Sequence, residues 1–368
     1  MRKNTKLPLI TNTIFAALIG GLSLWNVMAP KETVSWNENR TLAAFPSLSV
    51  SHIFGGSFDD DFERWFSDHF VHRDFWIELK SGLRRASLAI ENNDIYYARN
   101  DRLVSRFASY NPSVLDANLE TVDQFAKDCG TTANVLLVPT ASWGARSELP
   151  FGASDIDQIP LLEYAKTKLA GQNVIDYTQY ASPSPHLYFR TDHHWNEQGA
   201  YLGYAAIAKE VLHKEPERFQ YEEASPSFTG TMYSKSGAFW TKGDPIYRIL
   251  PEKPVNAVIT FDNGETIPSV FSEKRLAEKD KYMFYADGNH PYAKISTDVH
   301  NGRKAVIAKD SYSHILMPYL ICEYEEITLI DLRYYHEPVS QLLDDSSDLY
   351  VIYSLDNFAT DQSIAFLR

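Results

Sequence analysis

The stretch Lys304-Ala305-Val306-Ile307-Ala308-Lys309 decides the fold class, because it is a short and nearly continuous apolar run. Runs of this length are typical of strands that are buried on both faces of a parallel sheet. Three further runs have the same character: residues 134–139, 327–330 and 349–353. Between the runs, apolar residues recur at helical spacing over residues 114–127, 158–169 and 197–212. This alternation predicts a three-layer α/β/α domain around a doubly wound sheet.

The predicted α/β domain occupies residues 96–368 and carries an insertion at about 215–300. The insertion breaks the alternation, because it is rich in Gly, Pro, Ser, Thr and aromatic residues and has a β-like piece at 255–261. Residues 31–95 are expected to form a stalk and a helical neck. Within them, aromatic residues of 58–66 recur at helical spacing between acids, so we expect an amphipathic helix packed on the main domain.

Residues 7–29 form an uncharged stretch that is long enough to span a bilayer as a helix. Basic residues precede it and Trp25 lies near its outer end, which predicts that the rest of the chain lies outside the cytoplasm. A cleaved signal peptide is the alternative, because Val27-Met28-Ala29 resembles a small-residue cleavage site. The proline at position 30 and the length of the run favour an uncleaved, single-pass anchor over residues 1–30.

The composition is that of an ordinary globular protein, with 44% hydrophobic and 23% charged residues. Arg2, Lys3 and Lys6 are basic, but the net charge of −13 repels nucleic acid and no basic stripe opposes it. We therefore expect no nucleic-acid partner. Cys129 and Cys322 do not make a disulfide framework and have no metal-type spacing, so we expect two buried thiols.

A first chemical segment, Arg190-Thr191-Asp192-His193-His194-Trp195, lies directly before a predicted helix. An acid and a histidine two residues apart can converge from such a loop. The carboxylate then accepts the proton of one ring nitrogen and leaves the other nitrogen free as a base. A polar surface turn would use the same residue types.

A second chemical segment, Asp310-Ser311-Tyr312-Ser313-His314, follows the strand at 304–309. A serine at the carboxyl end of a parallel strand lies where α/β folds bind ligands, and a helix that begins there directs N–H groups at a developing oxyanion. Serine needs a positioned base, which the first segment offers. Alone, Asp-Ser after a strand is often a helix cap. Together, the two segments predict a Ser-His-Asp acyl-transfer enzyme.

Thr191-Asp192-His193-His194-Trp195, followed over a hundred residues later by Lys309-Asp310-Ser311-Tyr312-Ser313, resembles the DHHW family. That family is related to the AlgX, AlgJ and DltD-like branch of SGNH hydrolases. The likeness extends to three further segments: Glu38-Asn39-Arg40-x-Leu42, Asn289-His290-Pro291 and Asp331-Leu332-Arg333-Tyr334-Tyr335. It implies an SGNH-like domain at the cell membrane that O-acetylates an extracytoplasmic or cell-wall polysaccharide. It also implies a membrane-bound O-acyltransferase of the MBOAT type as acetyl donor, and neither a cofactor nor a metal.

Carried over residue by residue, the resemblance implies Ser311 as the nucleophile and His194 as the base. Asp192 would orient His194, and His193 takes the variable position of the Asp-x-His motif.

Lys309 stands where ordinary SGNH enzymes have a glycine that helps the backbone turn, which leaves the oxyanion hole open to question. The N–H of Ser311 is the first expected donor. Gly288 and Asn289 are candidate partners, although a simple turn explains them nearly as well. Arg333 is a candidate for holding an anionic or sugar group, with a structural salt bridge as the alternative.

Three other functions remain open from the residues. Asp192, His193, His194 and His213 include metal-ligand types, although the further Asp motifs of manganese phosphoesterases are missing. The same triad with water as acceptor would be an esterase or deacetylase. A non-catalytic polysaccharide-binding scaffold is the third alternative.

Overall fold

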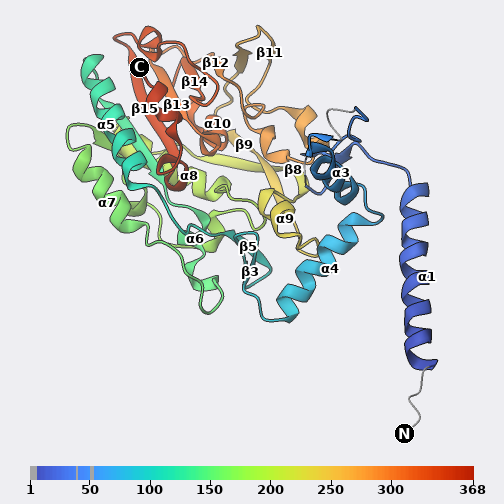
Figure 1. The fold of residues 1–368 in the computed structure, drawn as a ribbon. Helices are drawn as coiled ribbons and strands as arrows, with labels where there is room; N and C mark the ends of the chain where they lie inside the picture. Colours follow the sequence, from blue (N-terminus) through green and yellow to red (C-terminus); the bar gives the residue numbers. More distant parts are fainter. Residues whose placement is uncertain (1–5, 39, 50–53) are drawn as a thin grey trace.

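The computed structural model describes residues 6–38, 40–49 and 54–368 (Figure 1). Arg2, Lys3 and Asn39 lie outside the described residues. The centre of the molecule is an eight-stranded sheet with the strand order β11-β10-β12-β14-β13-β15-β6-β7. The strands of its parallel part are β6 (Ala133–Val138), β7 (Asn173–Val174), β13 (Lys304–Lys309), β14 (Glu326–Ile330) and β15 (Ser347–Ser354). The four apolar runs of the sequence are all strands of this parallel part.

Helices cover both faces of the sheet. Side chains of successive strand residues point to opposite faces, so each central strand contributes to two core clusters. Val135, Val306 and Val351 pack in one core cluster with α5 (Pro112–Asp128) and α7 (Ile159–Lys168). Leu136 and Ile307 pack in the other cluster with α8 (Glu197–Glu210). The three predicted helices are therefore present, and the domain has three layers. Shorter helices complete it: α6 (Ala141–Gly144), α10 (Met317–Leu320) and α11 (Leu355–Phe358).

The second half of the expected insertion extends the central sheet. β10 (Ala257–Phe261), β11 (Thr266–Ile267) and β12 (Tyr292–Thr297) pair antiparallel, and β12 pairs antiparallel with β14. The sheet is therefore mixed, and not parallel throughout. The burial of β10 and β12 alternates along the strand, which is typical of strands with only one covered face. These strands lack the continuous apolar run that identified the others.

The first half of the expected insertion does form a separate unit. β8 (Phe219–Phe228) and β9 (Asp244–Pro251) make a two-stranded antiparallel sheet, with α9 (Thr231–Ser236) between them. A three-stranded sheet of β3 (Glu91–Asn92), β4 (Ile95–Ala98) and β5 (Arg102–Ser105) crosses the expected boundary at residue 95. The neck and the main domain are thus joined by strand pairing.

The neck contains β1 (Val34–Ser35), β2 (Arg40–Thr41), α3 (Ser57–Asp68) and α4 (Arg73–Ala86). Ahead of it, α1 (Lys6–Met28) stands apart from the body of the molecule (Figure 1). Its stretch Ile10–Met28 has a mean hydropathy of 1.4 and is long and apolar enough to cross a membrane, by length and composition only. The side chain of Asn26 ties the end of this helix to the neck, because its Oδ1 accepts the N–H of Val71 (2.9 Å).

The remaining regular elements are short 3₁₀ helices: η1 (Arg146–Glu148), η2 (Tyr177–Gln179), η3 (Pro185–Leu187), η4 (Glu273–Ala277), η5 (Lys281–Phe284), η6 (Ser311–Leu316), η7 (Val339–Leu342) and η8 (Gln362–Phe366). Cys129 and Cys322 are both free and partly exposed.

Trp195 lies at the centre of the packing between α8 and the sheet and is fully buried. A Cβ atom on Gly203 of α8 would come within 2.6 Å of the indole ring. The absence of a side chain at position 203 therefore lets the helix lie directly on the ring.

Gly203→Ala should destabilise the fold by about 1–3 kcal/mol, because the added methyl group forces the indole or the helix to shift. Gly82 of α4 is the matched control, since a Cβ there would meet no atom within 4 Å. Gly82→Ala should stabilise the fold by about 0.5–1 kcal/mol through helix propensity. Urea denaturation measures both changes. Equal stabilities of Gly203→Ala and the parent would show that the indole moves freely.

Glu197 begins α8 directly after the Asp-His-His-Trp segment and is 9% exposed. Burial raises the pKa of its carboxyl from the ordinary 4.5 to about 7, and the charge of Asp244 adds to the shift. Between these two values the folded chain holds a proton that the unfolded chain has released. The stability contributed by this group is therefore lost as the pH rises through this window.

Glu197→Gln should remove this pH dependence. Relative to the parent, the variant should gain up to about 3 kcal/mol in free energy of unfolding between pH 4.5 and pH 8. Urea denaturation at the two pH values measures the gain. A difference between variant and parent that is the same at both values would contradict the raised pKa.

Candidate active site

The Asp-His-His-Trp segment forms a tight turn ahead of α8. Tyr188 and Trp195 pair as an antiparallel bridge across the turn, and the N–H of Phe189 donates to the carbonyl of His194 (3.2 Å). The indole N–H of Trp195 donates to the carbonyl of Tyr312 (2.8 Å), which lies next to Ser311. The motif tryptophan therefore joins the turn to the second chemical segment.

Ser311 is the first residue of η6, directly after β13. Asp310 caps this helix, since its Oδ1 accepts the N–H of Tyr312 (3.0 Å). The other oxygen of Asp310 accepts the N–H and hydroxyl of Ser354 (2.9 and 2.8 Å) and the amide of Asn357 (2.8 Å). With both oxygens occupied, this buried carboxylate fixes the backbone beside Ser311.

Three predicted site residues form one hydrogen-bonded chain. Asp192 Oδ1 lies 2.5 Å from Nδ1 of His194, and Nε2 of His194 lies 2.7 Å from Oγ of Ser311. With the Nδ1 proton shared with Asp192, Nε2 is left as an acceptor for the serine proton. The chain joins residues that are 117 positions apart in the sequence.

Asp192 is 2% exposed and is held by the β8–α9 connection. Its Oδ2 accepts the N–H of Thr231 (2.8 Å), and Oδ1 also accepts the N–H of His194 (3.1 Å). Burial alone would raise the pKa of Asp192, but the two neighbouring histidines and these hydrogen bonds hold it far below its usual value. A Cβ on Gly230 would lie 2.1 Å from Asp192 Oδ2, so only glycine lets this backbone approach the carboxylate.

Tyr282 of η5 forms the other side of the site. Its ring stacks on His194, with centroids 3.7 Å apart and planes 8° from parallel. Its hydroxyl donates to the carbonyl of Ser311 (2.9 Å). One side chain thus holds both the imidazole and the residue it bonds.

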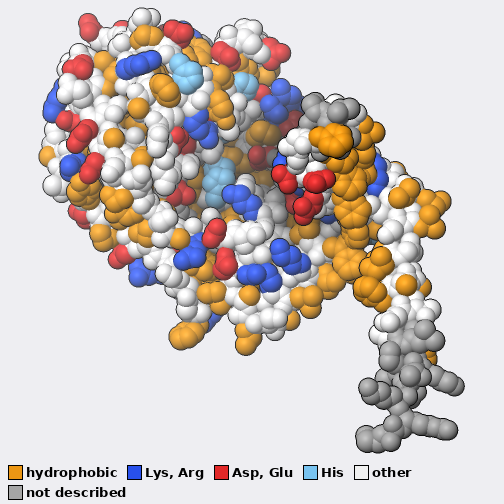
Figure 2. All heavy atoms as spheres, viewed as in Figure 1, with side chains coloured by type: hydrophobic (Ala, Val, Ile, Leu, Met, Phe, Trp, Pro, Cys, Tyr) orange, Lys and Arg blue, Asp and Glu red, His pale blue; other side chains and the backbone are white. Residues whose placement is uncertain are grey.

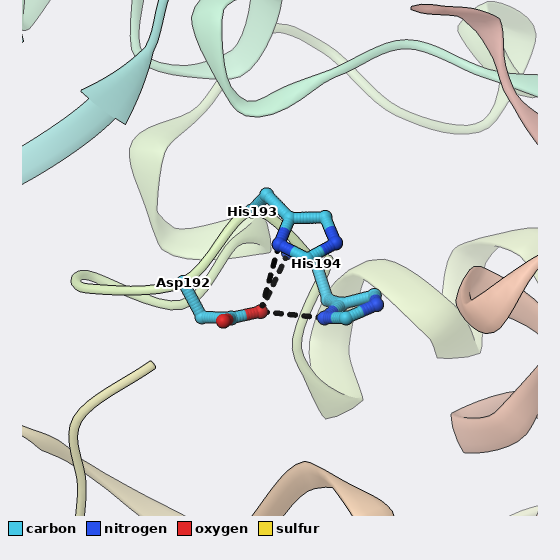
Figure 3. Close-up of side chains that lie close together, drawn as sticks. All are labelled: Asp192, His193 and His194. Atoms are coloured by element: carbon cyan, nitrogen blue, oxygen red, sulfur yellow. Dashed lines mark hydrogen bonds and ion pairs between the residues drawn. The ribbon is translucent and has the colours of Figure 1, made fainter. Parts of the chain in front are cut away.

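The pair of histidines also offers a possible metal site. Asp192, His193 and His194 each place a ligand-type atom within 4.8 Å of the others (Figure 3). His193 Nδ1 is 3.6 Å from Asp192 Oδ1, whereas His194 Nδ1 is at hydrogen-bond distance from the same oxygen. A metal ion between these atoms would have to displace that hydrogen bond.

Lys309, at the position of the usual glycine, is 2% exposed. Its ammonium donates to Nε2 of His314 (3.0 Å) and pairs with Asp331 (3.3 Å). Burial lowers the pKa of Lys309, and burial together with the Lys309 charge holds the pKa of His314 well below its usual value. The lysine thus fixes η6 from beneath, at the end of β13 where ordinary SGNH enzymes are expected to turn on glycine.

Arg333, Gly288 and Asn289 are not in contact with Ser311 through any hydrogen bond or ion pair of the described residues. Arg333 forms a two-pronged ion pair with Asp331 (2.8 and 2.6 Å), which is the salt-bridge alternative. Asn289 Oδ1 accepts a weak bond from Arg333 (3.4 Å). The N–H of Gly288 donates to the carbonyl of Tyr285 (3.3 Å). The buried carboxylate of Asp331 holds the guanidinium of Arg333 in this position and also pairs with Lys309.

Three residues of the site were not identified from the sequence: Gly230, Thr231 and Tyr282. The first two lie on the β8–α9 connection and the third on a 3₁₀ helix of the expected insertion. The only local signal was the Thr-Gly-Thr turn at 229–231, because contacts over such distances leave no periodicity.

The model of the family described as DHHW protein matches residues 113–330. No curated protein matches the chain.

Two solved structures share the fold. A DHHW family protein from Eubacterium siraeum is 21% identical with a TM-score of 0.64, over 75% of this chain and 96% of that chain. Bacillus cereus PatB1 with a sulfonyl adduct is 21% identical with a TM-score of 0.61, over 74% and 98%. The O-acetyltransferase domain of Pseudomonas putida AlgJ is more distant, at 14% identity and a TM-score of 0.45 over 73% and 94%.

The hydrogen-bonded chain predicts that Ser311 is unusually reactive toward phenylmethanesulfonyl fluoride. His194→Ala should slow its modification by roughly a thousandfold or more, because the serine loses its proton acceptor. Mass spectrometry of the intact protein measures the rate.

Ser313→Ala is the matched control for this labelling, since Ser313 is buried two residues away and its hydroxyl bonds Ile352 (3.4 Å). It should label at the parent rate, and Ser311→Ala should not label. Equal labelling of Ser311→Ala and the parent would place the reactive group elsewhere.

Proposed function

The chain belongs to the DHHW family, and we propose that it is an O-acetyltransferase that acts on an extracytoplasmic or cell-wall polysaccharide. The observation that carries the proposal is the chain from Asp192 through His194 to Ser311, with 2.5 and 2.7 Å contacts. It provides a serine, a base and an orienting carboxylate in the order that acyl transfer requires.

In the first step, Ser311 Oγ attacks the carbonyl carbon of an acetyl donor, and His194 Nε2 takes the hydroxyl proton. The C–O bond to the donor's leaving group breaks, and His194 returns the proton to that group. The product is acetyl-Ser311. No described hydrogen bond uses the N–H of Ser311, so this donor is available for the oxyanion.

In the second step, a sugar hydroxyl attacks the acetyl carbon and gives its proton to His194. The bond to Ser311 Oγ breaks, and His194 protonates the serine. Asp192, which stays ionised, stabilises the imidazolium that forms in each step. Tyr282 keeps the imidazole plane fixed while the proton moves.

We further propose that residues 96–368 form an SGNH-type domain, that residues 31–95 form its neck, and that α1 is an uncleaved membrane anchor. The apolar stretch Ile10–Met28 supports the anchor. Acetyl-CoA is not expected outside the cytoplasm. A membrane-bound O-acyltransferase of the MBOAT type would therefore supply the acetyl group, and the anchor would keep Ser311 near that source.

The test supplies the purified full-length protein in detergent micelles with 4-nitrophenyl acetate and a panel of neutral oligosaccharides. Mass spectrometry should detect acetylated sugar, and Ser311→Ala should lower the rate at least about a thousandfold. Release of acetate alone, with no acetylated sugar, would instead identify an esterase. Transfer by Ser311→Ala at the parent rate would contradict the serine mechanism.

A chelator arm addresses the three potential ligands Asp192, His193 and His194. Transfer should persist after treatment with EDTA, because the proposed steps use only protein groups. About one equivalent of tightly bound transition metal, together with loss of activity on chelation, would overturn the proposal.

A further inference from the structure

A cleft of about 400 Å³ lies between the neck and the catalytic domain. Figure 2 shows a hollow on this face of the molecule, with basic and acidic side chains at its rim and histidine side chains nearby. The neck contributes Glu38 and Arg40, which belong to the Glu-Asn-Arg segment of the sequence. The proposed mechanism uses neither residue. The other lining residues come from the turn before β4, from α9 and its N-terminal connection, and from the segment ahead of Tyr282.

One wall of the cleft is the support of Asp192. Gly230 and Thr231 line the cleft, and the N–H of Thr231 bonds Asp192 Oδ2 (2.8 Å). The opposite wall contains Lys279 and Asp280, directly ahead of η5 and its Tyr282. Each wall therefore includes or adjoins in sequence a residue that touches Asp192 or His194, so the cleft lies beside the active site.

Lys279 is the side chain of the cleft that is best suited to bind a ligand, because it is only 8% exposed and yet has unused N–H donors. Its ammonium donates to the hydroxyl of Thr229 and lies 4.4 Å over the ring of Tyr233. No ion pair of the described residues includes Lys279. An ammonium has three N–H donors, so two remain for a bound molecule.

The other charges of the cleft are largely compensated. Arg40 binds Asp68 through two nitrogens (2.8 and 2.5 Å), and Glu38 binds Arg40 and Arg73 (2.8 and 2.9 Å). The groups left for recognition are the ammonium groups of Lys279 and the exposed Lys235, the Asp280 carboxylate and the hydroxyls of Thr231 and Ser234.

This set contains two cations, one anion and neutral hydroxyls, and only one of the cations, Lys279, is buried. It therefore offers both donors and acceptors, with one positive charge in excess. Such a set matches a polyhydroxylated, uncharged molecule, whose hydroxyl groups both donate and accept. Burial lowers the pKa of Lys279 to about 8 and raises that of Asp280 to about 6, with the charge of Asp192 adding to the latter. Both groups are therefore mostly charged at pH 7.

We propose that this cleft binds a neutral sugar unit of the acceptor polymer through its hydroxyl groups, and so presents a neighbouring unit to acetyl-Ser311. The inference rests on the proposed acetyltransferase function and deepens it. The acceptor would enter along the neck, past Arg40, and reach the active site between Thr231 and Asp280.

The test uses the full chain in detergent micelles with two variants. Lys279→Met removes the ammonium and keeps the length of the side chain, and Ser234→Phe fills the cleft. Acylation is followed as the burst of 4-nitrophenol from 4-nitrophenyl acetate. Transfer is followed with cellopentaose, xylopentaose, a β-1,4-linked pentamer of N-acetylglucosamine and tetragalacturonate.

In both variants the KM for the best neutral acceptor should rise about tenfold, which is the value of one hydrogen bond to a charged group. The loss in the acylation burst should be much smaller than the loss in transfer. Lys242→Met is the matched control, since Lys242 is exposed and lies outside the cleft lining, and it should behave as the parent in both assays.

Each other outcome decides against the inference. An unchanged acceptor KM would show that the cleft binds no acceptor, and a parallel loss of acylation would assign it only to the support of Asp192. A preference for tetragalacturonate that Lys279→Met abolishes would replace the neutral sugar by an anionic one. A parent protein that acetylates none of the sugars and only releases acetate contradicts the proposed function instead.

Discussion

A reciprocal pair of hydrogen bonds brings the two halves of the active site together. The indole of Trp195 donates to the carbonyl of Tyr312, and the hydroxyl of Tyr312 donates to the carbonyl of His193. Neither the turn at 192–195 nor the start of η6 would by itself fix the distance between the two segments. With both bonds in place and Trp195 buried under α8, the imidazole of His194 and Oγ of Ser311 are held at 2.7 Å.

Around this pair of hydrogen bonds, several charged groups are buried. Asp192 and Asp310 are both nearly inaccessible, and each has its oxygens occupied by backbone N–H groups and side-chain donors. Lys309 is compensated by Asp331 below Ser311. Buried charges of this kind are costly unless fully paired, so the partners of each restrict its position to a small range. The geometry of the site is therefore set by electrostatics as much as by apolar packing.

The sequence was sufficient for those features that repeat locally. Continuous apolar runs located β6, β13, β14 and β15, and three- and four-residue spacing located α5, α7 and α8, because each pattern is complete within one element. Of the antiparallel strands, β10 coincides with the β-like piece expected at 255–261, whereas β12 escaped, since one exposed face leaves only alternating burial. Gly230 and Tyr282 escaped for a different reason: their importance lies in what they touch, and nothing in their own neighbourhoods depends on Asp192 or His194. Arg333 has the chemistry to hold an anionic or sugar group, and the structure adds its ion pair with the buried Asp331.

The position of β15 in the sheet has a consequence for when the active site can form. This strand is the last of the chain and yet lies between β13 and β6, so neither of these has its central neighbour until the C-terminal residues arrive. The strand ends at Ser354, and Ser354 and the following Asn357 hold the carboxylate of Asp310 beside Ser311. Pairing over so long a sequence separation is slow compared with local helix formation. A chain that is still being extended therefore holds Ser311 without its final backbone geometry.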